Sequence, residues 1–367
     1  MKVGIITFHF PHNYGAMIQA YAMQQKLKSF GHDVSIIDYT PDYHTTWYRK
    51  GRTFKECFEK SFFVTLRHLV GFILYEPTYS KRYNGFEIFR KSRMNLYPFN
   101  CKSVFSEFDV VVLGSDQIWD QPHTNNKFDG PYYGEGFQCK VFSYAASSKH
   151  KELDDNQKKE FRQRINKLFS IGVREESFAS LLRPLTNKQV SVNLDPTLIV
   201  DEKEFSNLNL SRPVKRKYVL VYELNEHKEV LRMARSYAKK INAKVISLVA
   251  YYSWKKRFSC LYDQTASPEK FLQYIKNAEF VFTSSFHGTA LSLVFEKQFY
   301  CIKQNSNSDL RMESLLNQLN LDDHFISLID YPSYNPINYE EVRRKLHGLR
   351  HASEEYLLRS LNSEIPF

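Results

Sequence analysis

Residues 279–295 read EFVFTSSFHGTALSLVF, and this stretch predicts a strand, a turn and a helix in succession. The apolar residues 280–282 are typical of a buried strand, and the small hydroxyl residues after them favour a turn. The apolar run beyond the following histidine and glycine favours a helix. Because parallel α/β sheets are built from such strand–turn–helix units, the stretch predicts an α/β fold.

The same turn carries groups that suit an anionic ligand. The N-terminus of a helix offers unpaired N–H groups and a partial positive charge, which favour phosphate or carboxylate. Ser284, Ser285 and Thr289 add hydroxyl donors. Gly288 permits close approach of the backbone, and His287 can transfer a proton near neutral pH. The turn predicts an anion site with an acid–base group beside it, or else a capped helix whose histidine only packs.

Strand-like and helix-like segments alternate along most of the 367 residues. This alternation predicts βαβ units with parallel sheets, and the length predicts two domains. We expect two Rossmann-like domains that face each other across a cleft, with ligands beyond the carboxyl ends of the strands. The predicted boundaries are an N-terminal domain at 1–207 with an aromatic helical insertion at about 42–100, a linker at 208–217, a second domain at 218–335, and a C-terminal helix at 336–367 that packs back on the first domain.

The overall composition indicates a globular protein, with 43% apolar and 25% charged residues. A formal net charge of +11 favours anionic partners such as phosphorylated small molecules or an anionic membrane surface, or it reflects a solvated basic surface alone. We expect no nucleic-acid partner, because no nucleic-acid-binding motif occurs. The five cysteines include no CxxC pair and the first residues read as a strand, so we expect a cytoplasmic protein without disulfides or structural zinc.

Residues 57–74 form the most hydrophobic segment, yet they fall short of a membrane span. Charged residues interrupt the segment, and a span needs about 20 apolar residues. Helical spacing places its large apolar residues on one face: Phe58, Phe62, Leu66, Leu69, Val70 and Ile73. We interpret this face as core or domain-packing surface. An interfacial membrane helix is the alternative, because four basic residues lie just upstream at 49–55.

A polar turn between the first predicted strand and helix is a second candidate site. Residues 7–16 read TFHFPHNYGA and contain His9 and His12, but no nearby carboxylate or cysteine completes a metal site. Asn13 and Tyr14 are candidate ligand contacts at the start of the helix. The alternative is that this segment only forms a turn.

Charged residues follow three other predicted elements. Asp116, in LGSDQIW at 113–119, ends a buried strand and suits a base or a hydroxyl ligand, with a helix N-cap as the alternative. Arg174 follows a β-branched run and is placed to hold a phosphate, or it forms an ion pair with Glu175, Glu176 or another acid. Arg311 lies near a predicted helix start, which is unfavourable for a cation unless an anion is close.

The order of these motifs resembles that of a known family. Along the chain they are HNYGA with QAYA, then LGSDQIW, GVREES, LDPT, SSFHGTA and RMESLL. Each motif is short, but six in this order and at these intervals are specific. Over residues 2 to about 321 the chain resembles the bacterial polysaccharide pyruvyl transferase family.

The resemblance implies a GT-B-like fold with catalysis in the cleft between the domains. It implies transfer of the enolpyruvyl group of phosphoenolpyruvate to a sugar of a surface or capsular polysaccharide, which forms a cyclic pyruvate ketal and releases phosphate. The family's histidine before glycine maps to His287, and its arginine in the GVREES-like motif maps to Arg174. Some members carry an arginine two residues before that histidine, where this chain has Ser285. We expect Arg311, Lys303 or Arg174 to supply that charge.

The predicted roles follow from these residues and from the resemblance. His287 is the expected acid, Asp116 the expected base or diol ligand, and Arg174 the expected phosphate or carboxylate clamp. Donor-binding residues are predicted at Arg174, Ser284, Ser285, Phe286, His287, Gly288, Thr289 and Arg311, and acceptor-binding residues at Asn13, Tyr14, Asp116, Gln117 and Trp119. Neither a metal nor a cofactor is expected, since phosphoenolpyruvate is itself the donor substrate.

The expected partners are phosphoenolpyruvate and a sugar or lipid-linked glycan acceptor. A lipid-linked acceptor would suit a basic protein at the inner face of the membrane. Two other functions stay open: a nucleotide-sugar glycosyltransferase of the same architecture, and a non-catalytic carbohydrate-binding protein.

Overall fold

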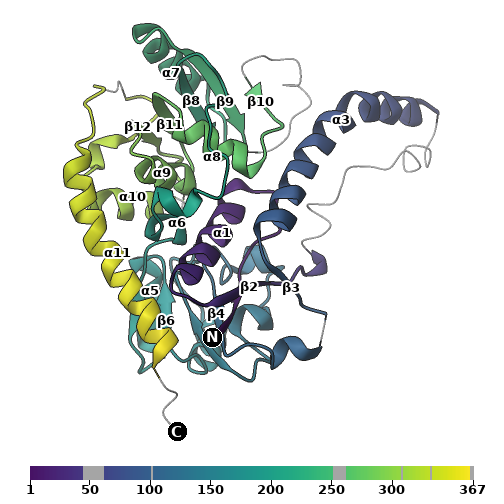
Figure 1. Ribbon diagram of the computed structural model, residues 1–367, viewed down its shortest axis with the longest axis vertical. Helices are drawn as coiled ribbons and strands as arrows, with labels where there is room; N and C mark the ends of the chain where they lie inside the picture. Colours follow the sequence, from purple (N-terminus) through teal and green to yellow (C-terminus); the bar gives the residue numbers. More distant parts are fainter. Residues whose placement is uncertain (44–61, 101, 251–261, 307–308, 331–332, 364–367) are drawn as a thin grey trace.

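Two parallel sheets with surrounding helices make up the protein (Figure 1). The computed structural model describes residues 1–43, 62–100, 102–250, 262–306, 309–330 and 333–363. The first sheet has the order β3-β2-β1-β4-β5, and its strands are β3 (Leu96–Pro98), β2 (Asp33–Asp38), β1 (Lys2–Ile6), β4 (Val110–Leu113) and β5 (Lys140–Ser143). A pair of short parallel strands, β6 (Ile171–Val173) and β7 (Val190–Val192), continues from it through bridges at Ala146.

The second sheet repeats this plan. Its order is β10-β9-β8-β11-β12-β13, and its strands are β10 (Tyr262–Asp263), β9 (Lys244–Val249), β8 (Tyr218–Glu223), β11 (Phe280–Thr283), β12 (Phe299–Ile302) and β13 (Phe325–Ile326). In both sheets the strand order reverses next to the first strand, between β1 and β4 and between β8 and β11. That order defines a doubly wound Rossmann-like sheet. The predicted fold, two Rossmann-like α/β domains in a GT-B-like arrangement, is confirmed.

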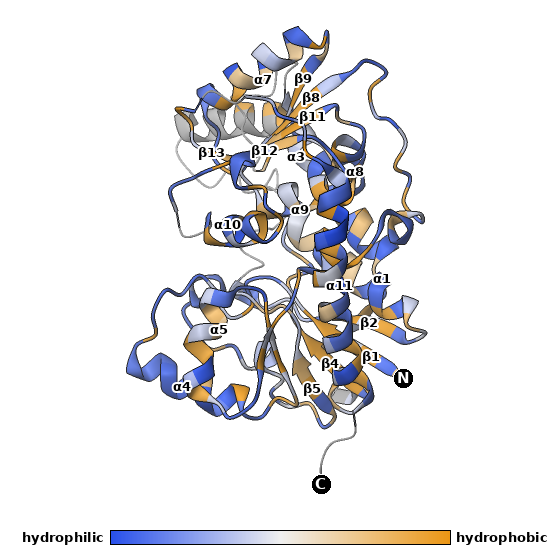
Figure 2. Ribbon diagram, turned by 90° about the vertical axis from the view of Figure 1, so that its left-hand side faces the viewer, coloured by the Kyte–Doolittle hydropathy of each residue, from blue (hydrophilic) through white to orange (hydrophobic). Residues whose placement is uncertain are grey.

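Helices cover the apolar strands, which Figure 2 shows as orange arrows. The helices are α1 (Tyr14–Ser29), α3 (Phe62–Arg93), α4 (Asp155–Ile165), α5 (Glu176–Leu182), α6 (Pro196–Ile199), α7 (Lys228–Lys240), α8 (Pro268–Lys276), α9 (Phe286–Val294), α10 (Asp309–Gln318) and α11 (Tyr339–Asn362). Side chains cap the three helices nearest the site, with Asn13 before α1, Asp195 before α6 and Ser285 before α9. Each cap accepts backbone N–H groups that the first helical turn leaves unpaired.

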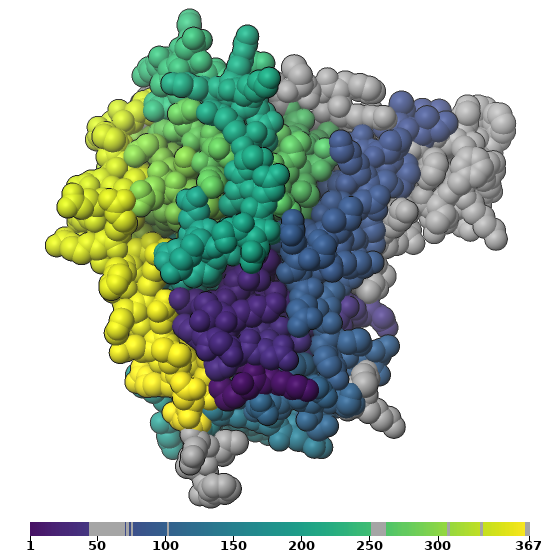
Figure 3. All heavy atoms as spheres, in the orientation of Figure 1, coloured from purple at the N-terminus to yellow at the C-terminus, as the bar shows by residue number. Residues whose placement is uncertain are grey.

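The two domains share one hydrophobic core. A single cluster joins buried side chains of α1, α8, α9 and α11 with residues of both sheets. The last helix, α11, contacts the first domain through Tyr356, whose hydroxyl donates to the Ser143 carbonyl at 2.8 Å. It contacts the second domain through an ion pair between Arg343 and Glu296 at 2.7 Å. In the space-filling view α1 lies between α11 and α3, so helices from three parts of the chain hold the domains together (Figure 3).

Two predictions about residues 42–100 need correction. The range predicted as a helical insertion also contains β3, which pairs with β2 inside the first sheet, so α3 is the crossover of a βαβ unit. Val70 and Ile73 on α3 are 49% and 64% exposed, so they are not core residues. Periodicity identified their helix face, but it does not reveal whether another element covers that face. Phe58 lies outside the described residues.

Candidate active site

A cleft of about 320 Å³ lies where the central strands of the two sheets end. Among its lining residues are Phe8, Pro11 and Asn13 after β1, Asp116 and Gln117 after β4, Leu224 and Asn225 after β8, and Ser285 and His287 after β11. These four strands flank the points where the two strand orders reverse, and ligands bind there because the crossovers on opposite faces leave a crevice. The volume lies in the range of about 300–1,000 Å³ that small-molecule sites occupy.

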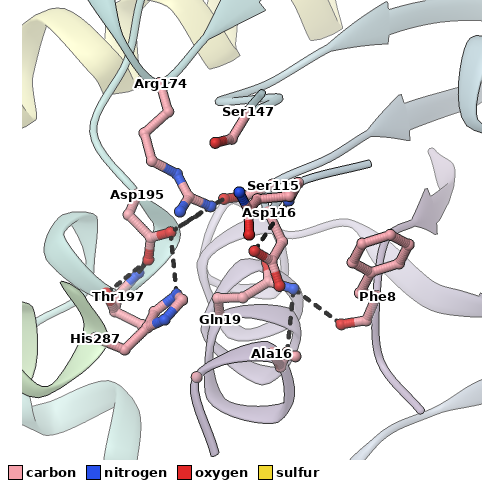
Figure 4. A network of polar contacts seen from close by, with 12 residues as sticks. Phe8, Ala16, Gln19, Ser115, Asp116, Ser147, Arg174, Asp195, Thr197 and His287 are labelled. Atoms are coloured by element: carbon pink, nitrogen blue, oxygen red, sulfur yellow. Dashed lines mark hydrogen bonds and ion pairs between the residues drawn. The ribbon is translucent and has the colours of Figure 1, made fainter. Parts of the chain in front are cut away.

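One buried carboxylate, that of Asp195, connects residues beside the cleft (Figure 4). Its Oδ2 atom lies 2.8 Å from Nη2 of Arg174 and accepts a 3.1 Å hydrogen bond from the Ser115 hydroxyl. Its Oδ1 atom accepts from the backbone N–H and the hydroxyl of Thr197, at 2.9 and 2.6 Å. Burial alone would raise the pKa of Asp195, but Arg174 and His287 outweigh burial and hold this pKa well below its ordinary value. Asp195 is therefore a fixed negative charge.

His287, on the first turn of α9, reaches toward this carboxylate from the second domain. Its Nε2 atom lies 3.6 Å from Oδ2 of Asp195, which is too long for a hydrogen bond. Nε2 has no hydrogen-bond partner among the described residues. The ring rests on the backbone of α1, since a Cβ atom added to Gly15 would lie 2.1 Å from Nδ1 of His287. His287 therefore lines the cleft and carries an unpaired, buried Nε2 atom beside Asp195.

Three basic side chains also line the cleft, those of Arg311, Lys149 and His123. Within the described ranges, neither Arg311 nor Lys149 forms an ion pair with a carboxylate, whereas His123 lies 3.5 Å from Asp120. Burial lowers the pKa of Arg311, and burial together with the charge of Arg311 lowers the pKa of Lys149. Burial and Lys149 also lower the pKa of His123. Arg311 and Lys149 have no carboxylate of the described residues at ion-pair distance, although Asp116 and Asp120 attract both at longer range, and such cations in a partly buried cleft favour an anionic ligand.

The lowered pKa of Lys149 predicts a pH effect on anion binding. As the pH rises above neutrality, Lys149 should lose its proton below the ordinary lysine pKa of about 10.4, and the affinity for an anionic donor should fall with it. The variant Lys149→Arg should keep the donor KM flat over the same alkaline range, because a guanidinium stays charged. Identical pH profiles of the donor KM for the two proteins would contradict this assignment.

Three polar residues line the cleft from the first domain. Asp116 has a φ of 70°, a left-handed conformation that aspartate tolerates, and its Oδ1 atom accepts the Gln117 N–H at 2.9 Å. The buried Nε2 of Gln117 has no hydrogen-bond partner among the described residues, so it is a donor available to a ligand. Asn13 lines the cleft and also caps α1 by accepting from the backbone of Gly15 and Ala16. The Asn13 side chain therefore stabilises the turn, which was the alternative to ligand binding for residues 7–16.

Two predicted acceptor contacts, Tyr14 and Trp119, are core residues outside the cleft. Tyr14 stacks on Phe271 with ring centroids 4.5 Å apart, and its hydroxyl donates to the carbonyl of Ala266 at the domain junction. Trp119 stacks on Tyr133 with centroids 5.5 Å apart. Both are almost fully buried, so the structure does not place them where an acceptor could contact them.

The predicted donor residues of 284–289 divide into two groups. Ser285, Phe286 and His287 line the cleft. Ser284, Gly288 and Thr289 instead shape the turn, with the Ser284 hydroxyl accepting from the backbone N–H of Leu224 at 3.0 Å and Gly288 packed tightly on Thr283. Some family members carry an arginine where this chain has Ser285, and Arg311 was one of three residues expected to supply that charge. Arg311 lines the cleft. Lys303 does not line it and lies over the ring of Phe325.

Asp195, Lys149 and His123 belong to the site but carry no predicted role. Asp195 lies in the LDPT motif, where an acid before proline is typical of a helix N-cap, and this local function hides its contact with Arg174. Lys149 follows β5, and this position after a strand is the sequence feature that could have identified it as a site residue. His123 follows β4 within a long irregular connection, and no pattern in the sequence marks it.

A search of protein-family models matched the model described as polysaccharide pyruvyl transferase over residues 13–306. The chain belongs to the polysaccharide pyruvyl transferase family. It is therefore a transferase, and the family implies a sugar or glycan acceptor. The matched range includes His287, Arg174 and Asp195 but ends before Arg311, so the family assignment rests on most of the site without that arginine.

Solved structures similar to this family member share little sequence with it. They include MnaA of S. aureus with UDP, at TM-score 0.46 and 11% identity over 100% of this chain and 98% of that chain. A UDP-GlcNAc 2-epimerase from Neisseria meningitidis bound to UDP-GlcNAc gives TM-score 0.44 and 11% identity, covering 99% and 100%. The glycosyltransferase SnogD from Streptomyces nogalater gives 0.42 and 11%, covering 99% and 95%. A search of curated proteins gave no match.

Metal-binding and membrane-spanning features were also sought in the described part of the chain. In these ranges, no three or more His, Cys, Asp or Glu side chains gather in a group suited to a metal ion. None of the helices there combines the length and hydrophobicity that a bilayer crossing demands. The expectation that the reaction uses neither metal nor cofactor stays a prediction.

Proposed function

We propose that the protein transfers the enolpyruvyl group of phosphoenolpyruvate to two hydroxyl groups of a sugar, forming a cyclic ketal and releasing phosphate. One observation carries the proposal: a proton donor, His287, shares a cleft with two cations that lack carboxylate partners, Arg311 and Lys149. Phosphoenolpyruvate matches this arrangement, because its phosphate and carboxylate need cations and its methylene carbon needs a proton.

The reaction begins with proton transfer from Nε2 of His287 to the methylene carbon. Positive charge develops on the adjacent carbon, where a sugar hydroxyl attacks as Asp116 accepts its proton. Phosphate then leaves, and a second hydroxyl closes the ring. Asp116 passes the first hydroxyl proton to the departing phosphate and the second hydroxyl proton restores His287, so both groups are regenerated and atoms and charge balance. General acid catalysis of this kind contributes about 10²–10⁴-fold.

The cations act by holding the donor in place. Arg311 and Lys149 neutralise the phosphate as it leaves, and positive charge that is already in place in the cleft stabilises that step without reorganisation. Arg174 differs from its predicted role as a direct clamp, since it pairs with Asp195 and does not line the cleft. We assign it to positioning Asp195 beside His287. The scheme uses no metal and no cofactor, so we expect turnover to persist in EDTA.

Phosphate release with defined donors and acceptors tests the proposal. Purified protein is incubated with phosphoenolpyruvate and a panel of galactosides and N-acetylhexosaminides, and free phosphate and the ketal are measured. Phosphate release that requires an acceptor supports the proposed function. Release of a nucleoside diphosphate from a nucleotide-sugar panel, with no reaction of phosphoenolpyruvate, would assign the cleft to glycosyl transfer instead.

We further propose that the protein works in the cytoplasm at an anionic membrane surface, on a lipid-linked acceptor. Support comes from α3, which extends from the body of the protein in Figure 1. Val70, Ile73 and Leu74 are exposed at helical spacing, and Lys81 and Lys91 are exposed on the same face. An apolar face with lysines suits binding to anionic lipid. Flotation with anionic vesicles but not with neutral ones is the expected result, and equal flotation or none would contradict it.

A further inference from the structure

A second, smaller chamber of about 70 Å³ adjoins the cleft. Phe286 and Arg311 line both spaces, so the Phe286 side chain forms part of the wall between them. Two guanidinium groups lie near this ring, with Cζ of Arg174 at 5.2 Å and Cζ of Arg311 at 5.8 Å from its centroid. The other walls come from the segment before α6 and from α10 and α11.

Four residues that line this chamber carry buried polar atoms without partners. Arg174 is only 7% exposed, and its Nε and Nη1 atoms have no hydrogen-bond partner among the described residues. The same holds for Nε of Arg311, Oε2 of Glu175 and Oδ1 of Asn193. Burial raises the pKa of Glu175, while Arg174 and Arg311 act in the opposite direction. Buried polar groups are normally paired, so the three unpaired N–H groups of Arg174 and Arg311 indicate a ligand that bears acceptor oxygens.

Two guanidinium groups face this chamber with different partners. Asp195 compensates Arg174 at 2.8 Å, whereas no carboxylate among the described residues lies within ion-pair distance of Arg311, and Glu175 attracts it at longer range. Arg311 is thus a cation without a close counter-ion beside the unpaired N–H groups of Arg174. Guanidinium groups bind the oxygens of phosphate with strong, charge-assisted hydrogen bonds.

The size of the chamber restricts the anion. A buried water needs about 10–15 Å³ of such space, so about 70 Å³ admits a small tetrahedral oxyanion. The cleft, at about 320 Å³, is the space that can hold donor and sugar together. The chamber also reaches solvent on its own side, because Ala352, Gln318 and Val192 in its lining are exposed.

We propose that this chamber is a binding site for inorganic phosphate, which receives the phosphate leaving the donor and releases it between α10 and α11. The role as a product site rests on the proposed function. Its physical advantage is that a bulky glycan in the cleft need not leave before phosphate does. Arg311, shared by both spaces, keeps contact with the phosphate as it passes Phe286.

Calorimetric titration with inorganic phosphate, with and without saturating phosphoenolpyruvate and with no acceptor present, tests the site. Phosphate should bind in both cases, and its binding should weaken without vanishing when the donor is present. The variant Ala352→Glu places a negative charge at the mouth of the chamber and should weaken phosphate binding about tenfold, as expected for an added repulsion of about 1.4 kcal/mol. Leu358→Glu, at an exposed position of the same helix outside the chamber, should leave the affinity within about twofold.

Three results would overturn the inference. They are the absence of phosphate binding to the wild-type protein, complete loss of binding when phosphoenolpyruvate is present, and equal effects of the two glutamate variants. The acceptor-dependent turnover assay separates this failure from failure of the proposed function, because it measures the donor reaction directly. Phosphate binding to a protein that never turns over phosphoenolpyruvate would overturn the product role along with the proposed function.

Discussion

Replacing His287 by glutamine should lower kcat for acceptor-dependent phosphate release by about 10²–10⁴-fold, the usual contribution of a general acid. Glutamine fills similar space on the first turn of α9 but cannot give up a proton near neutral pH. The thermal unfolding midpoint should change little, because His287 makes no hydrogen bond through Nε2. The KM for phosphoenolpyruvate should change much less than kcat, since Arg311 and Lys149 remain.

The matched control is His347→Gln, an exposed histidine on α11. It should keep the wild-type rate, which rules out a general effect of removing a histidine. A His287→Gln protein with full kcat would show that another group protonates the donor. In that case Lys149 and His123, two groups of the cleft whose pKa values are lowered, become the acids to test.

Adding one methyl group at Gly15 should be nearly as damaging as removing the histidine. The Cβ atom of Gly15→Ala would lie 2.1 Å from Nδ1 and 2.5 Å from Cγ of His287, so the ring must move by about an ångström. A displacement of that size at a reacting group costs about a hundredfold in rate. The helix itself should tolerate alanine, because Gly15 lies in α1 with no positive φ.

Gly348→Ala provides the control for this substitution. Gly348 also lies within a helix, α11, but a Cβ atom there meets nothing within 4 Å. This variant should keep full activity and gain about 0.5–1 kcal/mol of stability from the lower entropy of the unfolded chain. In a His287→Gln background, Gly15→Ala should add much less than its effect alone, because both changes act on the same side chain. Full additivity would argue against the contact as the cause.

Much of the fold could be predicted, because buried parallel strands read as short apolar runs. The strand predicted at 280–282 is β11, which the structure places at Phe280–Thr283. Strand β3 could not be found in this way, since it has only three residues and lies behind a long aromatic helix. Its membership of the sheet depends on pairing with β2, a contact between distant residues that no local pattern records.

The site was predictable in part for the same reason. His287, Asp116 and Asn13 follow strand ends, and parallel strands bring their carboxyl ends to one edge. Tyr14 and Trp119 also follow strand ends, yet their rings turn into the core. The elements packed around a ring decide which way it faces, and the local sequence does not record them. Arg174 was predicted as a direct clamp because its partner Asp195, twenty-one residues further along the chain, could not be foreseen from sequence.

The contact between Asp195 and His287 joins residues of different domains. Asp195 precedes α6 at the end of the first domain, whereas His287 follows β11 in the second. Any motion that opens the cleft moves the histidine away from its nearest carboxylate and away from Gly15 at the same time. In an open molecule His287 is therefore not in position to donate a proton. Phosphoenolpyruvate bound to one domain alone would not react with water until the two domains close around it.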